Sequence, residues 1–448
     1  MEIGEVPAAT FCCDRNLFIW FVRQLNAQEV QSTAVIVMRT NAMHDVIVIG
    51  AGAAGLMAAI RAAERGKRTL LIEKNQRPGV KILMSGGTRC NITQNTDDRG
   101  IVAAYGASGK FLYAALAAFG VADTVQFFEE EGVATKIEDT GKIFPVSNKA
   151  SDVLGALLGR LRRSTAELAL AEPVLDLQRI DSRFQVVTST RSIASSKIIL
   201  CSGGKSYPGS GTTGDGYAWA AAMGHTIVPL RPALVPMRVV APWTADLRGI
   251  TLPDVAVRVL EGESELVRRR GSLLFAHFGL SGPVVLDVSR VVSRHAIPNS
   301  LQLEIDFLPA ISEPVLDDFL RNESIHSGKK LLAVVLAEHL PRRLADAVLV
   351  QAGLSADRTV AALARQDRQR LSRLCKRLRL LIAGTLGFEK AEVTAGGVAL
   401  SEVSSRDMQS KIVPGLYLAG EILDLDGPIG GYNFQAAWST GWLAGNSV

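Results

Sequence analysis

One stretch near the start of the chain restricts its fold more than any other: HDVIVIGAGAAGLMAAIRAAERGKRTLLIEK, residues 44–74. Residues 46–49 form a continuous apolar run, as expected for a parallel strand that is buried on both faces. A glycine-rich turn, a helix-forming run over 56–65 and a second apolar run over 69–72 follow, and the second run stops at Glu73. This order predicts a strand–turn–helix–strand unit at the start of a doubly wound α/β sheet.

The glycines of this unit match the G-x-G-x-x-G pattern of Rossmann-like dinucleotide-binding folds. Gly50 permits a tight turn, Gly52 lets a pyrophosphate approach the backbone, and Gly55 lets the helix pack closely behind it. Glu73 is placed to accept hydrogen bonds from ribose hydroxyls, and its charge would repel a 2′-phosphate, so NAD or FAD fits better than NADP. The alternative is an unliganded α/β core that only needs a tight turn. The predicted nucleotide contacts here are Gly50, Gly52, Ala53, Ala54, Gly55, Glu73 and Lys74.

The next segment favours FAD over NAD. Residues 79–93, GVKILMSGGTRCNIT, have the composition of a basic, glycine-rich loop, where NAD enzymes usually have an ordinary crossover helix. Such a loop offers backbone donors to a second phosphate or to an isoalloxazine ring. The alternative is a surface loop with a coincidental glycine pair. The predicted cofactor contacts in this loop are Lys81, Ser85, Gly86, Gly87, Arg89, Cys90 and Asn91.

A third buried strand is predicted over 196–201, and it leads into a turn that would return the chain to the nucleotide. The predicted contacts in this turn are Ser202, Gly203 and Gly204. Gly209, Gly211 and Gly214 match G-x-G-x-x-G again, but a polar loop separates them from the strand and no acid-ended strand follows, so we assign no second nucleotide site. Asp215 is predicted to cap a helix, or to contact FAD as in the TGDG turn of fumarate-reductase-like flavoproteins.

These motifs together resemble a known family. VIVIGAGAAGLMAA and KILMSGGTRCNIT, with AHFGLSGP, FEKAEVTAGGV and the C-terminal stretch, are similar to the bacterial BaiN/YhiN-type, or aminoacetone-oxidase-type, flavoproteins over residues 43–445. The resemblance implies a glutathione-reductase-like FAD domain with inserted β-barrel-like and small helical units. The family commonly has glycine where this chain has Thr88. Its members are variously reductases of conjugated carbonyl compounds and amine oxidases, so the resemblance implies a flavin-dependent oxidoreductase without fixing the substrate.

Two inserted units are predicted from the change in periodicity after residue 230. Short alternating segments divided by Gly, Pro and Asn predict an antiparallel β unit, to which we assign 231–310 and 386–394. Residues 311–385 have apolar residues at i, i+3 and i+4 with arginines opposite, which predicts a helical unit. Its arginine face is interpreted as a solvated surface, with a nucleic-acid patch as the alternative. The FAD-binding domain then comprises 43–230 and 395–448.

The C-terminal stretch GLYLAGEILDLDGPIGGYNFQAAWSTGWLAG, residues 415–445, is predicted to close the cofactor site. A last buried strand over 416–419 would end at the carboxyl edge of the sheet, and a helix from Tyr432 would direct its N-terminal dipole at the flavin. By analogy with FAD domains of this class, Glu421 would meet the ribityl or pyrophosphate region, whereas a docked tail is the alternative. The predicted contacts are Gly420, Glu421, Gly430, Gly431, Tyr432 and Asn433.

Composition limits the remaining function classes. A net charge of +5 on 448 residues is only mildly basic, so nucleic acid is not the expected partner. No apolar stretch approaches the roughly 18 residues of a membrane span. The five cysteines lack CxxC and metal-ligand spacing, so we expect a reduced, cytoplasmic protein without a metal. Residues 1–42 show no clear periodicity, and a native start at Met43 or Met38 would make them an extension; a genuine short helix is the alternative.

The expected function is FAD-dependent hydride transfer between flavin N5 and a small organic substrate, with NAD(P)H or O2 in the other half-reaction. His277 and Tyr432 are the candidates for a catalytic acid or base, although His277 between two phenylalanines is also typical of a core or hinge histidine. The alternative is an FAD-binding protein with a structural, sensing or RNA-associated role. A flavin-dependent tRNA methyltransferase would need a folate pocket and a strongly basic groove, which the sequence does not indicate. The oligomeric state is left open.

Overall fold

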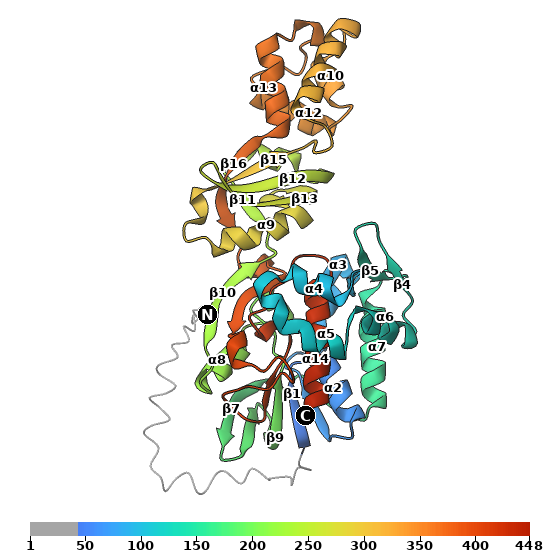
Figure 1. Cartoon of the computed structure of the whole chain (residues 1–448), viewed down its shortest axis with the longest axis vertical. Coiled ribbons are helices and arrows are strands. Elements are labelled where there is room, and N and C mark those ends of the chain that lie inside the picture. Colours follow the sequence, from blue (N-terminus) through green and yellow to red (C-terminus); the bar gives the residue numbers. More distant parts are fainter. Residues whose placement is uncertain (1–43) are drawn as a thin grey trace, which may run out of the picture. The chain divides into compact units, whose positions relative to one another are not determined.

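The computed structural model describes residues 44–448, so the expectations for residues 1–42 lie outside the described residues. Its main sheet has seven strands in the order β6-β2-β1-β9-β8-β7, and β18 pairs with β9. Strands β1, β9 and β7 of this sheet are labelled in Figure 1. Neighbours from β6 to β9, and β18 on β9, run parallel, while β8 and β7 are antiparallel. The strands are β1 His44–Ile49, β2 Thr69–Ile72, β6 Glu167–Ala169, β7 Val174–Ile180, β8 Arg183–Thr188, β9 Ser192–Leu200 and β18 Leu416–Leu418.

Strand β9 can hold both β8 and β18 because it divides its length between them. Ser195 in its first half lies opposite Phe184 of β8, and Leu200 at its end lies opposite Leu418 of β18. The parallel strands β1, β2, β9 and β18 therefore end side by side at one edge of the sheet. The predicted doubly wound, Rossmann-like α/β fold is confirmed, and each predicted strand of the sheet is present within four residues of its expected bounds.

Alternate residues of β1 belong to two different cores, which explains its continuous apolar sequence. Val46 and Val48 pack in one core with α2, α7 and α14, and Ile47 and Ile49 pack in another with α5 and α8. The helices of this part are α2 Ala53–Glu64, α3 Val80–Thr88, α4 Asp98–Ala104, α5 Tyr113–Ala118, α6 Val121–Glu130, α7 Ala150–Arg163, α8 Asp215–Ala222 and α14 Tyr432–Ser447. A small sheet, β3 Thr93–Gln94, β5 Lys142–Pro145 and β4 Thr135–Ile137, completes it.

The C-terminal helix α14 packs unusually closely against α2, the helix of the glycine fingerprint. A Cβ on Gly441 would lie 2.3 Å from the carbonyl oxygen of Ala54, and one on Gly445 would lie 2.3 Å from that of Ala58. The Trp438 side chain is fully buried and donates a hydrogen bond of 3.0 Å from Nε1 to the carbonyl oxygen of Ile92. The two ends of the described chain are thus joined in one core.

Two further units are inserted between β9 and β18. The antiparallel pair β10 Ile227–Ala233 and β17 Val393–Val398 leads to a closed barrel in the order β11-β14-β13-β12-β15-β16. The barrel elements are β11 Met237–Val239, β12 Thr251–Glu261, β13 Ser264–Ala276, β14 Gly279–Ser281, α9 Pro283–Arg294, β15 Leu301–Asp306 and β16 Leu378–Thr385. Between β15 and β16 lie α10 Glu313–His326, α11 Leu332–Leu336, α12 Arg342–Gln351 and α13 Arg365–Lys376.

The helical unit predicted over residues 311–385 was wrong at its end. Residues Leu378–Thr385 form barrel strand β16, in which Leu378, Leu380 and Ile382 are buried while the residues between them are exposed. This period of two begins immediately after α13, so a helical pattern conceals it in the sequence. Over residues 44–448, no single helix is long and apolar enough to cross a membrane. One bent pair of helical segments, Gly106–Ala118 with Val121–Glu130, meets the length and composition criteria jointly.

Candidate functional site

A cavity of about 540 Å³ opens where the parallel strands end. Gly50 after β1, Glu73 after β2, Ser202 after β9 and Gly420 after β18 all line it. The carboxyl edge of an α/β sheet is where such folds bind their ligands. The predicted cofactor contacts all line this cavity except Gly55, Cys90, Gly204 and Tyr432.

The three fingerprint glycines differ in what surrounds them. Gly50 has a φ of 100°, and a Cβ there would lie 2.6 Å from the carbonyl oxygen of Cys201, so packing requires glycine. A Cβ on Gly55 would lie 1.8 Å from the Gly50 carbonyl oxygen, which explains the close approach of α2. A Cβ on Gly52 would meet no atom within 4 Å. The turn is therefore tight on its inner side and open at Gly52, where a pyrophosphate can approach the backbone.

Glu73 is a buried carboxylate that backbone groups hold in place. One oxygen accepts a hydrogen bond of 2.8 Å from the Ala51 N–H, and the other accepts one of 2.9 Å from the Asn75 N–H. Within residues 44–448 it forms no ion pair, so lone pairs remain on both oxygens for hydroxyl donors in the cavity. This geometry suits the ribose contact expected from the sequence.

Lys74 and Asp215 form an ion pair at the rim of the cavity, with 2.6 Å between Nζ and Oδ2. The pair joins the end of β2 to the start of α8. The prediction that Asp215 caps α8 was wrong, because Gly214, with a φ of 85°, occupies the N-cap position and Asp215 is the first helical residue. Asp215 still lines the cavity.

Ser202 carries a buried hydroxyl that has no hydrogen-bond partner within the described chain. A buried polar group left without a partner costs about 1–3 kcal/mol, so such groups usually have one. The Ser202 side chain lies in the wall of the cavity, directly after β9. We interpret the unsatisfied hydroxyl as a group that pairs with a ligand there.

The loop expected over residues 79–93 is in part a helix. Helix α3 begins after Gly79, and its regular helical backbone ends before Ser85, where Ser85, Gly86 and Gly87 adopt non-helical angles. The prediction of a loop was therefore wrong for the first half, because the glycine pair concealed the helix-forming KILM sequence before it. The second half is irregular, as expected.

Thr88 continues this irregular turn with a φ of 69°, in the left-handed region. Glycine, which the resembling family commonly has here, adopts this conformation without strain. Cys90 also has a positive φ, of 60°, and its side chain is fully buried away from the cavity. Burial raises the pKa of the Cys90 thiol to about 12, so the group stays a neutral thiol at physiological pH.

Lys81 and Glu421, both predicted to contact the cofactor, form an ion pair with each other at 2.6 Å. Glu421 accepts further hydrogen bonds from the Ser206 hydroxyl at 2.6 Å and from the Thr394 N–H at 2.8 Å. The network joins α3, the turn after β9, β17 and the end of β18. It fixes the Lys81 ammonium, which also lies 2.7 Å from the Ser206 hydroxyl, in the cavity wall.

Sequence reasoning missed a second group of charged residues in the same cavity, Glu392 and Lys142. The Glu392 side chain is exposed where it borders the cavity, but the protein around the cavity partly withdraws it from bulk water. Desolvation therefore raises the pKa of its carboxyl group, while the charges of Lys81 and Lys142 act in the opposite direction. Within the described residues, the Glu392 carboxylate has no hydrogen-bond partner. The only signal in the sequence is an acid directly before a buried run, in AEVTAGGV.

The two residues considered for acid–base catalysis are placed differently. His277 is exposed in the turn between β13 and β14, contacts Phe278 edge to face, and does not line the cavity, so the core interpretation was wrong. Tyr432 begins α14, as predicted, and its carbonyl oxygen accepts a hydrogen bond of 3.0 Å from the Tyr105 hydroxyl. Tyr105, but not Tyr432, lines the cavity.

The glycine pair before α14 has a structural reason. A Cβ on Gly431 would lie 2.5 Å from the Thr93 carbonyl carbon, so β3 requires glycine at this point. Gly430 and Asn433 line the cavity, and Asn433 Oδ1 accepts a hydrogen bond of 2.8 Å from the Gly427 N–H. The loop before α14 is thereby fixed where it meets the cavity.

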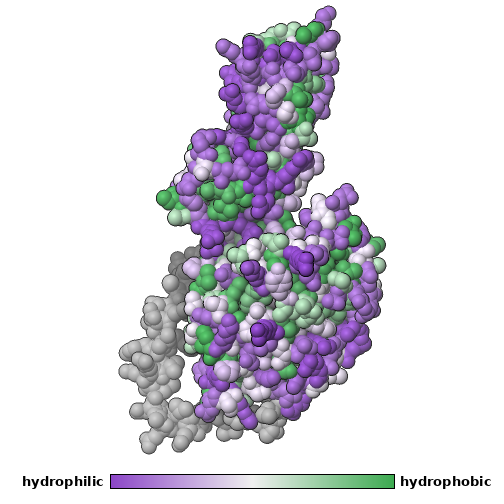
Figure 2. All heavy atoms as spheres, viewed as in Figure 1, coloured by the Kyte–Doolittle hydropathy of each residue, from purple (hydrophilic) through white to green (hydrophobic). Residues whose placement is uncertain are grey.

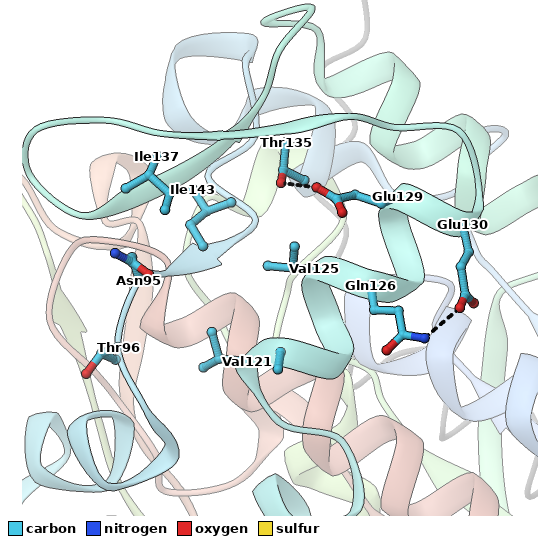
Figure 3. A pocket seen from close by; sticks show the side chains of 11 residues that line it. Asn95, Thr96, Val121, Val125, Gln126, Glu129, Glu130, Thr135, Ile137 and Ile143 are labelled. Carbon is cyan, nitrogen blue, oxygen red and sulfur yellow. Dashed lines mark hydrogen bonds between the residues drawn. The ribbon is translucent and has the colours of Figure 1, made fainter.

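A larger hollow of about 720 Å³ lies elsewhere, between α6 and strands β4 and β5 (Figure 3). Four of its polar side chains pair with one another: Gln126 donates to Glu130 at 2.7 Å, and Thr135 donates to Glu129 at 2.6 Å. None of the predicted cofactor contacts lines it. The smaller cavity at the strand ends, with its unsatisfied hydroxyl and open glycine turn, is therefore the candidate site, and its donor set fits a dinucleotide such as FAD.

Comparison with known proteins agrees with this geometry. The sequence profile of the HI0933-like protein Rossmann domain matches residues 44–447. Ribosomal RNA dihydrouridine synthase of Escherichia coli is 35% identical over 407 residues, covering 90% of this chain and 98% of that protein. The protein of the same name from Haemophilus influenzae is 32% identical over 410 residues, with coverage of 90% and 98%.

A relative with a different name is equally similar. The 3-dehydro-bile acid delta(4,6)-reductase of Clostridium scindens is 32% identical over 409 residues, covering 91% of this chain and 99% of that protein. The profile match and these identities span nearly the whole described chain, including both inserted units. The protein therefore belongs to the HI0933-like family of FAD-binding oxidoreductases, which is built on a Rossmann domain.

Proposed function

We propose that this protein is a flavin-dependent reductase of a carbon–carbon double bond that is conjugated to a carbonyl group. The names of two relatives describe reactions in which such a double bond is reduced. Dihydrouridine is uridine that has lost the ring double bond conjugated to a carbonyl, and a 3-oxo steroid with 4,6 double bonds is a conjugated ketone. The structural observation that supports the proposal is Glu392, a carboxyl group with a raised pKa in the wall of the cofactor cavity.

The residues that would hold FAD follow from the geometry of the cavity. Glu73 would accept from the ribose hydroxyls, the open turn at Gly52 would meet the pyrophosphate, and Ser202 would pair with a polar atom of the cofactor. The network of Lys81 and Glu421 would fix a positive charge beside the cofactor. When bound, FAD supplies a hydride equivalent at N5, with NAD(P)H as the proposed source of electrons.

Glu392 would hold the proton that the reaction requires. Saturating a conjugated double bond adds a hydride to the carbon remote from the carbonyl and a proton to the adjacent carbon. Because desolvation at the cavity raises its pKa, the Glu392 carboxyl keeps a proton to higher pH than a glutamate in bulk water. After the proton leaves, Lys81 and Lys142 stabilise the resulting carboxylate. General acids of this kind typically contribute about 10²–10⁴-fold to a rate.

The test separates the two half-reactions. The holoenzyme is mixed anaerobically with NADH or NADPH, and the reduced enzyme is then mixed with 2-cyclohexen-1-one or with transcribed ribosomal RNA. Glu392→Gln should bleach as the wild type does, but its reoxidation by the substrate should be slower by about 100-fold. The wild-type reoxidation should slow as pH rises through the raised pKa of Glu392, whereas Glu392→Gln should show no such dependence.

Glu389→Gln is the matched control, because Glu389 is an exposed acid three residues away that does not line the cavity. It should behave as the wild type in both half-reactions. Equal reoxidation rates in Glu392→Gln and the wild type would remove the role assigned to Glu392. A reduced wild-type enzyme that neither substrate reoxidises would contradict the proposed reaction itself.

A further inference from the structure

Helix α13 uses the cations on its inner face to hold the helical insert together. Arg368 is nearly buried and pairs with Asp317 of α10 at 2.8 Å. Lys376 is also nearly buried and pairs at 2.7 Å with Asp306, at the end of β15. These ion pairs sit beside the buried Leu371 and Cys375, so this face has a structural explanation.

The opposite face of α13, which we call the basic face, has no such structural explanation. By the 3.6-residue period it consists of Gln366, Gln369, Arg370 and Arg373, and we include Arg377, the residue that follows the helix; all five are exposed. It contains no acid, whereas surface helices that serve only solubility usually mix both signs.

The arginines of the basic face keep most of their hydrogen-bonding capacity. Within the described residues, Arg373 forms no ion pair and donates no side-chain hydrogen bond. Arg370 contacts Asp367 at 2.9 Å, and Arg377 lies 3.7 Å from Glu313. Exposed pairs of this kind contribute about 0–1 kcal/mol and yield readily to a stronger anion.

The distribution of charge over the chain also indicates that this part of the protein attracts an anion. Residues 311–385 contain 13 Lys and Arg against 8 Asp and Glu, so this segment carries +5, which equals the net charge of the whole chain. The rest of the chain is neutral. In Figure 2, the surface of the unit formed by α10–α13 that faces the viewer is largely hydrophilic, in contrast to the mixed surface around the nucleotide-binding sheet.

We propose that the basic face of α13 docks the phosphate backbone of an RNA that carries the reducible base. This inference rests on the proposed function and names its substrate class as a uracil ring within RNA. Arginine pairs with phosphate through two parallel hydrogen bonds, and glutamine side chains add neutral donors between the charges. Strand β16 of the barrel follows α13 directly, and β17, which begins after Glu392, is the next strand in the sequence.

The lack of aromatic residues on α13 does not argue against this partner. Aromatic platforms serve single strands, whose bases are free to stack. Folded RNA presents mainly phosphates and sugars, which arginine reads by charge and geometry. The basic face suits such a folded RNA.

The test compares two triple variants that remove the same charge. R370Q/R373Q/R377Q removes the arginines of the basic face, and R99Q/R162Q/R183Q removes three exposed arginines of the nucleotide-binding part that form no ion pairs within residues 44–448. Filter binding of transcribed ribosomal RNA is measured over a series of KCl concentrations, with duplex DNA and phosphatidylglycerol vesicles as competing anions.

The basic-face variant should bind RNA about 10-fold or more weakly near physiological salt, and the slope of log affinity against log salt should fall by about 2–3, as expected for the loss of three phosphate contacts. The control variant should lose less than about 3-fold. Equal losses in both variants, or a loss of vesicle binding without a loss of RNA binding, would overturn the proposal. Flavin content and 2-cyclohexen-1-one reduction should be unchanged in both variants, so a failure of RNA docking is distinguishable from a failure of the proposed reaction.

Discussion

Ser202 and Ser206, both on the turn after β9, differ in whether the protein itself provides a hydrogen-bond partner for the hydroxyl group. The Ser206 hydroxyl donates to Glu421 at 2.6 Å and lies 2.7 Å from the Lys81 ammonium, so the protein satisfies it fully. The Ser202 hydroxyl is buried and unsatisfied within the described chain. The same side chain therefore stabilises the apoprotein at one position and weakens it at the other.

Ser202→Ala should make the apoprotein more stable and the cofactor weaker. Removing an unsatisfied buried hydroxyl raises the free energy of unfolding by about 1 kcal/mol, whereas losing its hydrogen bond to FAD lowers the affinity about 5–10-fold. Denaturant unfolding of the apoprotein and titration of flavin fluorescence measure the two effects. Ser206→Ala is the counterpart, and it should lower apoprotein stability by about 1–3 kcal/mol. A loss of apoprotein stability in Ser202→Ala would contradict the interpretation of its hydroxyl.

Thr88 stores backbone strain in the turn beside the cavity, because a β-branched residue there has a φ of 69°. Left-handed backbone costs such a residue about 1–2 kcal/mol, and the greater freedom of unfolded glycine returns part of this. Thr88→Gly should therefore raise the free energy of unfolding by about 0.5–1 kcal/mol. Thr88→Ala keeps a Cβ and should stay within about 0.5 kcal/mol of the wild type. Equal effects of the two substitutions on chemical denaturation would exclude backbone strain as the cause.

At the scale of elements, the contact between α14 and α2 determines how the cavity is held. Helix α2 begins at the open turn, and α14 presses its glycines onto the carbonyl oxygens of Ala54 and Ala58. Ala54 itself lines the cavity. A displacement of α14 therefore moves the part of the backbone that faces the pyrophosphate.

Gly441→Ala should destabilise the protein and weaken FAD binding together. The added Cβ would lie 2.3 Å from the Ala54 carbonyl oxygen, and separating two packed helices to relieve this overlap costs about 1–3 kcal/mol. Gly155→Ala in α7 is the control, because a Cβ there meets nothing within 4 Å. It should stabilise the helix by up to about 1 kcal/mol and leave the cofactor affinity unchanged. Unfolding curves and flavin titrations of both variants provide the comparison.

Elements with a single clear period were predictable, and those at a change of period were not. Strand β1, helix α2 and helix α14 each follow one pattern flanked by glycine, and all three occur as expected. Helix α3 was missed because it ends in a glycine pair, and β16 was missed because its alternation starts directly after the helical pattern of α13. In both cases the neighbouring segment dominates the sequence signal.

At the scale of the whole molecule, the site combines segments that are distant in sequence. The contacts that follow strand ends, such as Gly50 and Ser202, were predictable because parallel strands must end at a common edge. Glu392 and Lys142 were not, since neither belongs to a motif and only the tertiary fold brings them to the same cavity. The pairing of Lys81 with Glu421, which are 340 positions apart, likewise depends on the complete fold.

The joining of α2 to α14 also has a consequence for how the protein is made. Synthesis proceeds from the N-terminus, and segments fold as they emerge from the ribosome. Helix α2 is synthesised early, but the glycines that cover it belong to α14, the last helix of the described residues, and β18 is completed only shortly before. The nucleotide site is therefore incomplete until α14 has been synthesised and has packed on α2. Flavin binding that depends on this contact must follow that step.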